Sequence, residues 1–361
     1  MIPHSRPTLG PEEKQAIKEV LDSGHIAQGK KVGEFEKGFC EFTGRRFAVA
    51  VSSGSSALHL SLIALEAGKG DEVILPSYTC TALLHAVEAV GAKPVLADID
   101  LEDFNLSVSE VKKKIRRKTK AILVPHSFGR AAQMETLVDL KIPVIEDGTQ
   151  ALGASVGDEK VGSFGILSIF SFYATKMITT GEGGMVLTNF PRLAERVFDL
   201  RDYDKKETHQ FRTNSKMTDI EAAMGIEQLK KLPFFIEKRR HIASGYREIF
   251  SGSDVVTPQE DAQRDHVYFR YVVRFPKKSK ERFKELEAKG LEVKKPVFKP
   301  LHQYLGLSDT LFPNTQRAMR ETCSLPIFPS LKENEWGTIA QALKPTDKSR
   351  GKVAGKNPVR V

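Results

Sequence analysis

Apolar and polar positions follow two alternating patterns between residues 47 and 147 of the chain. Short continuous apolar runs predict buried strands at 48–51, 73–75, 94–97, 121–125 and 144–146. Between them, helical periodicity predicts helices at about 55–67, 81–90 and 134–140. This alternation is typical of a parallel sheet covered by helices on both faces, with right-handed crossovers. The sequence therefore predicts an α/β fold.

The remainder of the chain has a different texture. Further helices are predicted at 11–24, 193–201, 219–230 and 234–250, with Pro233 near the end of the third. A strand at 266–275, a helix at 280–289 and a Pro-rich stretch at 295–300 follow. We expect a large domain at 1–235, a smaller α+β domain at 236–345, and a flexible basic tail at 346–361. The first helix of the large domain is free to pack on the smaller one.

The composition is that of a globular protein, with 40% hydrophobic and 28% charged residues. No apolar run approaches the roughly 20 residues that span a bilayer, and the segment 1–6 lacks the apolar core of a signal peptide. Cys40, Cys80 and Cys323 have no metal-ligand spacing and are odd in number. We therefore expect a cytoplasmic protein without a membrane segment, a disulfide framework or a metal site.

The net charge of +9 arises largely from two basic segments, 112–120 and the tail after Lys344. The first is typical of the solvated face of a helix, and the second of a frayed terminus. Nucleic-acid binding would call for aromatic residues interleaved with a basic stripe, and the sequence has no such stripe. We expect no nucleic-acid partner, although a positive surface could steer an anionic small substrate.

Candidate chemistry centres on Lys176. The run 166–173 predicts a buried strand, and a glycine-rich turn follows the lysine at 181–184. A lysine at the end of a core strand is costly to bury as a cation, so its amine is a candidate nucleophile with a lowered pKa. Position alone leaves an ordinary surface lysine as the alternative.

Two other segments also follow predicted strands, where open parallel sheets bind ligands. The segment 52–57 joins a strand to a buried helix, and its free N–H groups and Gly54 favour an anion, although serine is also a common helix cap. Asp147 directly follows another strand, as a helix cap or as the partner of a cation. A phosphate cradle, an acid and an amine, in that order, are the three parts that a pyridoxal phosphate enzyme needs.

The chain resembles the DegT/DnrJ/StrS-type sugar aminotransferases, which are pyridoxal phosphate enzymes of fold type I. The resemblance covers roughly residues 1–345 and includes AVAVSSGSSALHLSL, VIEDGTQALGA and SFYATKMITTGEGGMVLTN, the last of which is highly specific for the family. It implies a large domain with a mostly parallel sheet between helices and a smaller α+β domain. It also implies transfer of an amino group from glutamate or glutamine to a nucleotide-linked keto sugar, within amino-sugar biosynthesis.

The resemblance assigns roles to individual residues. It makes Lys176 the internal-aldimine lysine and proton shuttle, pairs Asp147 with the pyridinium nitrogen, and sets Gln150 beside the phenolic oxygen. Phosphate contacts are implied for Ser55, Ser56 and Ser171, with Gly54 in the same loop, and Asn214 is implied to reach the phosphate of a partner subunit, hence a homodimer with shared active sites. His302 lies in a segment that lines the substrate site in relatives.

The sequence departs from the family at the position two after Tyr78, which is usually Phe or Trp and stacks on the pyridine ring. Here it is Cys80, whose sulfur can pack against an aromatic face. Two alternatives share the fold: a pyridoxal phosphate sugar dehydratase, and a non-catalytic regulatory member. Some dehydrating relatives carry His at the lysine position, so Lys176 favours the aminotransferase.

Overall fold

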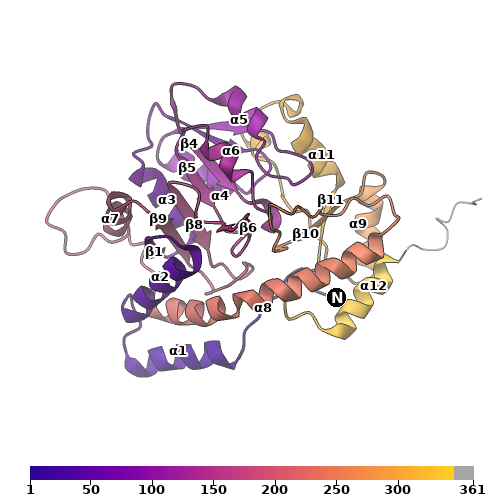
Figure 1. Ribbon diagram of the computed structural model, residues 1–361, viewed down its shortest axis with the longest axis horizontal. Coiled ribbons are helices and arrows are strands. Elements are labelled where there is room, and N and C mark those ends of the chain that lie inside the picture. Colours follow the sequence, from indigo (N-terminus) through magenta and orange to yellow (C-terminus); the bar gives the residue numbers. More distant parts are fainter. Residues whose placement is uncertain (345–361) are drawn as a thin grey trace, which may run out of the picture.

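One mixed sheet of seven strands lies at the centre of residues 1–344, the part of the chain that the computed structural model describes (Figure 1). Its order is β1-β9-β8-β5-β4-β2-β3. All pairs are parallel except those of β9, which runs antiparallel to β1 and β8. The bounds are Phe47–Val51 (β1), Glu72–Pro76 (β2), Lys93–Ala97 (β3), Thr119–Pro125 (β4), Val144–Asp147 (β5), Leu167–Ser171 (β8) and Gly184–Thr188 (β9). The predicted α/β fold with a mostly parallel sheet is confirmed.

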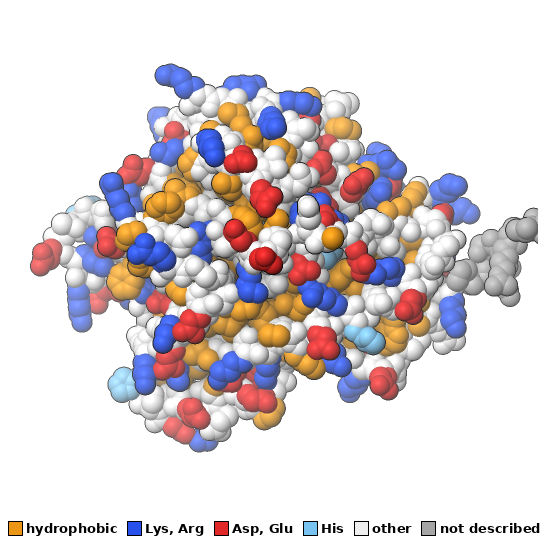
Figure 2. Space-filling model, in the orientation of Figure 1, with side chains coloured by type: hydrophobic (Ala, Val, Ile, Leu, Met, Phe, Trp, Pro, Cys, Tyr) orange, Lys and Arg blue, Asp and Glu red, His pale blue; other side chains and the backbone are white. Residues whose placement is uncertain are grey.

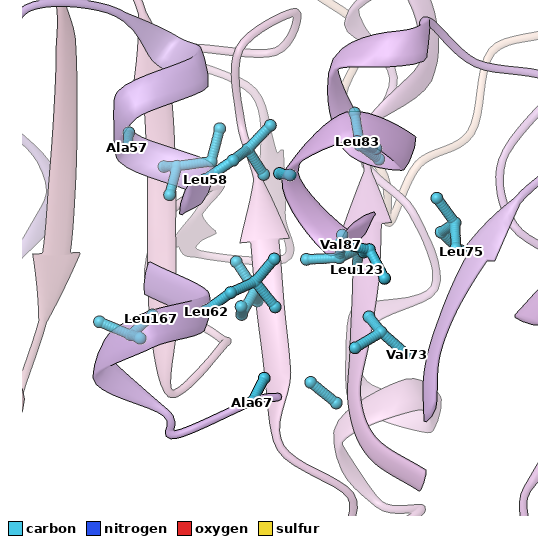
Figure 3. Close-up of a cluster of buried hydrophobic side chains, with 14 of the residues drawn as sticks. Ala57, Leu58, Leu62, Ala67, Val73, Leu75, Leu83, Val87, Leu123 and Leu167 are labelled. Atoms are coloured by element: carbon cyan, nitrogen blue, oxygen red, sulfur yellow. The ribbon is translucent and has the colours of Figure 1, made fainter. Parts of the chain in front are cut away.

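Helices cover both faces of this sheet. On one face lie α3 (Gly54–Ala64), α4 (Thr81–Ala89) and α7 (Pro191–Leu200), and Figure 3 shows leucines and valines of α3 and α4 packed over the strands. The other face carries α2 (Lys30–Thr43), α5 (Val108–Lys114), α6 (Met134–Val138) and the first half of α8 (Asp219–Phe250). Helix α3 is buried almost all round, as its continuous apolar sequence predicts.

Helix α8 is continuous over 32 residues and contains Pro233 (Figure 1). The prediction of two separate helices at this proline is wrong. The first half of α8 packs on α1 (Pro11–Ser23) and α2, and the second half enters the core of the C-terminal part. This packing outweighs the cost of the backbone hydrogen bond that a proline cannot donate. The helix crosses residue 235, where we placed the domain boundary, and belongs to both parts.

The C-terminal part is built on an antiparallel pair, β10 (Tyr271–Arg274) and β11 (Thr322–Leu325). The helices there are α9 (Ser279–Ala288), α10 (Leu301–Tyr304), α11 (Pro313–Glu321) and α12 (Glu333–Leu343). The first residues of the chain join this part, because Ile2 N donates to Gly290 O and the His4 ring bonds Ser324 Oγ. The tail predicted at 346–361 lies outside the described residues.

Minor elements complete the described chain: the short pair β6 (Ser155–Val156) and β7 (Glu159–Lys160), and the 3-10 turns η1 (Ser127–Gly129) and η2 (Asp309–Leu311). Within residues 1–344, no helix is both long enough and apolar enough to cross a membrane. On the face that Figure 2 shows, Lys and Arg side chains are scattered among Asp and Glu rather than gathered in a stripe.

A buried carboxylate ties the centre of the sheet together. Glu146 in β5 is fully buried and accepts hydrogen bonds from five donors: His126 Nε2, Gly162 N, Phe164 N, Gly165 N and Ser168 Oγ. Ala132 N donates to His126 Nδ1, so the histidine proton is on Nε2, which faces the carboxylate. Burial raises the pKa of Glu146, but the hydrogen bonds from His126 and the backbone outweigh it and lower the pKa overall.

We predict that Glu146→Gln lowers the free energy of unfolding by about 3 kcal/mol, because the amide presents N–H groups to donors that need an acceptor. A lowered folded pKa stabilises the fold above the unfolded value of about 4.3, and this contribution is lost as the pH falls through the folded pKa. Urea unfolding between pH 3 and 7 should therefore show a weaker pH dependence in the variant. Glu237→Gln, at an exposed position of α8, is the matched control. Equal stability of the two variants would contradict the account.

Candidate active site

Chemically active segments meet at one edge of the sheet. Strands β1, β2, β5 and β8 all point the same way, so the residues that follow them lie along their shared carboxyl edge. These residues are 52–56 after β1, 78–80 after β2, 147–150 at the end of β5, and 171–176 after β8. The three segments that the sequence singled out are therefore neighbours in the fold.

A cavity of about 310 Å³ opens at this edge and is lined by Lys176. Two other predicted site residues, Cys80 and Gln150, line it as well. Sequence reasoning did not predict several further lining residues, among them Phe128, Tyr173, Phe269, Arg270, Lys299 and Tyr304. Most of these come from loops or from the C-terminal part, where no local pattern marks them.

Lys176 lies in a turn, with its N–H bonded to Tyr173 O at 2.9 Å. Its Nζ is 5.4 Å from the centroid of the Phe269 ring, and its side chain is partly buried. Burial lowers the pKa of this amine, and the nearby Arg270 charge adds to the effect, while Cys80 and Asp147 oppose it. A lowered pKa keeps more of the amine in its neutral, nucleophilic form than in a free lysine.

Asp147 is buried at the end of β5, where Thr149 N donates to its Oδ1 at 3.0 Å. Burial raises the pKa of this carboxyl, and the hydrogen bond from Thr149 and the charge of Lys176 offset only part of the rise. In residues 1–344 no cation lies within ion-pair distance of it. The carboxyl is thus suited to pair with a cationic group of a ligand.

An anion cradle forms at the start of α3. Ser53 caps this helix, and its Oγ accepts from Ser56 N at 3.0 Å. The N–H groups of Gly54 and Ser55 have no acceptor in the described part of the chain. A Cβ on Gly54 would lie 2.7 Å from Ser171 Cβ, so only glycine lets this loop approach β8. Free N–H groups at a helix start, with the hydroxyls of Ser55 and Ser171 beside them, fit a phosphate.

Gln150 is held at the cavity by a backbone hydrogen bond, whereas Cys80 is exposed there. Phe128 N donates to Gln150 Oε1 at 3.0 Å, which fixes the amide so that its nitrogen remains a donor for a ligand. Cys80 is exposed at the N-cap of α4. Tyr78, two residues earlier, is instead buried against Phe104 and Phe128, and its hydroxyl bonds Thr322 Oγ1.

Seven predicted site residues are not part of the cavity lining: Gly54, Ser55, Ser56, Asp147 and Ser171, whose positions are given above, and Asn214 and His302. Asn214 is exposed in the segment after α7, one residue before Ser215, whose carbonyl accepts from Ser52 N. His302 is fully buried: its Nδ1 bonds Ser77 Oγ at 2.6 Å and its Nε2 bonds Asp309 Oδ1 at 2.9 Å. Both ring nitrogens of His302 are thus engaged within the chain, and its role toward a substrate stays a prediction.

The arrangement fits pyridoxal phosphate. The free N–H groups of Gly54 and Ser55 suit the phosphate, Asp147 suits a protonated pyridine nitrogen, and Gln150 can donate to the phenolic oxygen. Lys176 can supply the amine. These groups follow three strands at one edge of the sheet.

Comparison with known proteins identifies the family of the chain. The model of the DegT/DnrJ/EryC1/StrS aminotransferase family matches residues 7–344. GDP-perosamine synthase of Escherichia coli O157:H7 is 36% identical over 356 residues, which cover 95% of this chain and 97% of that protein. The same enzyme of Vibrio cholerae is 34% identical over 362 residues, or 95% and 98% of the two chains. The crystal structure of DesV from S. venezuelae, in complex with a ketimine intermediate, superposes with a TM-score of 0.88 at 32% identity, covering 92% and 93% of the chains.

We predict opposite effects of Asp147→Asn on the protein without and with pyridoxal phosphate. A raised folded pKa stabilises the cofactor-free fold only at low pH, and that contribution is lost as the pH rises from about 4 through the folded pKa. At pH 7.5 the neutral amide avoids the buried charge, so the melting temperature of the cofactor-free variant should rise. Its affinity for pyridoxal phosphate should fall by at least about tenfold, since a charge-assisted hydrogen bond is lost.

Thermal melts with and without the cofactor, together with a fluorescence titration, measure both effects. Asp139→Asn, at an exposed position after α6, serves as the control. A lower melting temperature of the cofactor-free variant, or unchanged affinity, would count against the role of Asp147.

Proposed function

We propose that this chain, which belongs to the DegT/DnrJ/EryC1/StrS aminotransferase family, moves an amino group from glutamate or glutamine to a nucleotide-linked keto sugar. It is a pyridoxal-phosphate-dependent sugar aminotransferase. The observation that supports the proposed amino transfer is that Lys176, Asp147 and the anion cradle meet at one edge of the sheet. The relatives named GDP-perosamine synthase support a nucleotide-linked acceptor.

Different residues of the proposed site have different chemical roles. When bound, pyridoxal phosphate supplies an aldehyde that condenses with amines and a ring that withdraws electrons from the bond to be broken. Asp147 would hold the proton on the ring nitrogen, because its carboxylate stabilises a cation there. Lys176 Nζ would take a proton from the α-carbon of the donor and return it to the former aldehyde carbon of the cofactor. Its lowered pKa favours the base form for the first of these steps.

The surroundings of the lysine suit a polar anionic acceptor. Lys299 lines the same cavity, and its amine lies 4.5 Å from the centroid of the Tyr304 ring. A cation at the cavity favours an acceptor that carries phosphate. Three free and scattered cysteines support the proposal that the enzyme works in the cytoplasm.

The first test is a donor half-reaction with the purified holoenzyme. Glutamate or glutamine alone should bleach the visible absorbance of the bound cofactor, and a nucleotide-linked keto sugar should restore it. Lys176→Ala should abolish both changes, because it removes the amine that carries the proton. Turnover of keto sugar by this variant would contradict the assignment, and colour that no amino donor moves would point to a different reaction.

We further propose a homodimer with shared sites, in which Asn214 contacts the phosphate bound to the partner subunit. The segment that carries Asn214 is exposed here, and exposed aromatic residues, Tyr203 and Phe211, lie in the same stretch. A contact between subunits would cover these rings. Asn214→Ala should then weaken cofactor binding by roughly tenfold, the effect of one hydrogen bond to a charged group.

Mixed dimers distinguish a shared site from a separate one. In a dimer of one Lys176→Ala and one Asn214→Ala subunit, a shared arrangement leaves one site with both native residues. Cofactor affinity at that site should therefore return to the wild-type value. If Asn214 acted within its own subunit, no site would be intact, and the weakened affinity would persist.

A further inference from the structure

Arg270 is a cation of the active-site cavity that the roles described so far do not use. It precedes β10, and its guanidinium carbon lies 5.6 Å from the centroid of the Phe269 ring. Lys176 Nζ lies 5.4 Å from the same centroid. The amine of Lys176 and the guanidinium therefore lie near the same aromatic ring, and both residues line the cavity.

The guanidinium of Arg270 has few partners within the chain. Of its five N–H donors, one on Nη1 has an acceptor, the Pro296 carbonyl at 3.0 Å, and the other four have none among residues 1–344. In residues 1–344 no carboxylate lies within ion-pair distance of it, whereas the buried Arg201 pairs with Glu36 and the buried Arg130 with Asp261. Burial lowers the pKa of Arg270, as expected for a cation held without a counter-ion. An anionic ligand would supply the missing partner.

The backbone holds Arg270 firmly at the cavity. Arg270 N donates to Phe128 O at 3.1 Å, and Val267 N donates to Gly129 O at 2.9 Å. Gly129 has a φ of +104°, and a Cβ there would lie 2.6 Å from Phe269 N, so only glycine allows this close approach. The contact joins the C-terminal part to the loop that also orients Gln150. Arg270 is thus placed by a rigid junction of the two parts.

We propose that Arg270 binds the α-carboxylate of the amino donor and so sets the donor's α-carbon beside Lys176. The inference rests on the proposed aminotransferase function and adds the residue that recognises the donor. The planar guanidinium fork matches a carboxylate in two parallel hydrogen bonds. In an α-amino acid the carboxylate is attached directly to the reacting carbon, whereas the phosphates of a nucleotide-linked sugar are separated from it by the sugar ring. A cation close to Lys176 therefore suits the donor.

The test compares the two half-reactions in Arg270→Gln and Arg270→Lys holoenzymes. Arg270→Gln should raise the glutamate concentration for half-maximal bleaching by roughly tenfold to a hundredfold, the range expected for charge-assisted hydrogen bonds. Arg270→Lys should lie between this variant and wild type, since a lysine keeps the charge and loses the fork. The keto-sugar concentration for half-maximal restoration of the absorbance should stay within about twofold of the wild-type value, because the guanidinium binds the donor's carboxylate and not the keto sugar.

Binding without turnover gives a second readout. 2-Methylglutamate has an α-carboxylate but no α-proton, so its dissociation constant follows from the shift of the cofactor absorbance. It should rise by the same factor in Arg270→Gln. 4-Aminobutyrate, which lacks an α-carboxylate, should bind wild type and variant equally. Arg247→Gln, which removes an arginine paired with Glu260 outside the cavity lining, is the matched control.

The possible outcomes separate this inference from the proposed function. If wild type fails to react with any amino donor, the proposed function is wrong. If wild type reacts and Arg270→Gln weakens only the keto-sugar half-reaction, the guanidinium binds the acceptor and the inference is wrong. Unchanged donor binding in Arg270→Gln also contradicts the inference. A loss of cofactor absorbance in both Arg270 variants contradicts it as well, because Arg270 would then act in cofactor binding or in stabilising the fold.

Discussion

The buried carboxylate of Glu146 is the interaction on which the site depends. It gathers four N–H or O–H donors from the loop 162–168 and a fifth from His126, and so holds β5, β8 and the loop between them in one register. The next residue along β5, Asp147, points to the opposite face of the strand. β8 in turn leads to Ser171 and Lys176. Fixing one carboxylate inside the sheet thereby places the acid and the amine at its edge.

The two parts of the chain contribute different chemistry to the cavity. The sheet of the large part provides Lys176 in the cavity lining, and the anion cradle and Asp147 at the ends of neighbouring strands. The C-terminal part adds Phe269, Arg270 and Lys299 across the opening. Because α8 runs through both parts and Arg270 N bonds Phe128 O, the two sets of residues are held in a fixed relation. The residues proposed for cofactor chemistry and those proposed for substrate recognition are therefore joined by backbone hydrogen bonds between the two parts.

The sequence predicts those site residues whose position follows from neighbouring residues in the chain, and not those placed by contacts between distant segments. Lys176, Asp147 and the loop 52–57 each follow a recognisable buried strand, so their meeting at one edge required only the parallel topology. Phe128 and Arg270 are brought together by a contact across more than a hundred residues, which no local pattern records. Pro233 predicts a helix end, but tertiary packing on both sides of it keeps α8 continuous. His302 shares a segment with cavity residues, but its hydrogen bonds to Ser77 and Asp309 turn it inward.

The central claim is that Lys176 is the amine that carries pyridoxal phosphate. Borohydride reduction of the holoenzyme, followed by proteolysis and mass spectrometry, tests it most directly. The account predicts a reduced pyridoxyl phosphate group on the peptide that contains Lys176, and on no other peptide. The same group on Lys299, which lines the same cavity, or no labelled lysine in a protein saturated with the cofactor, would contradict the account.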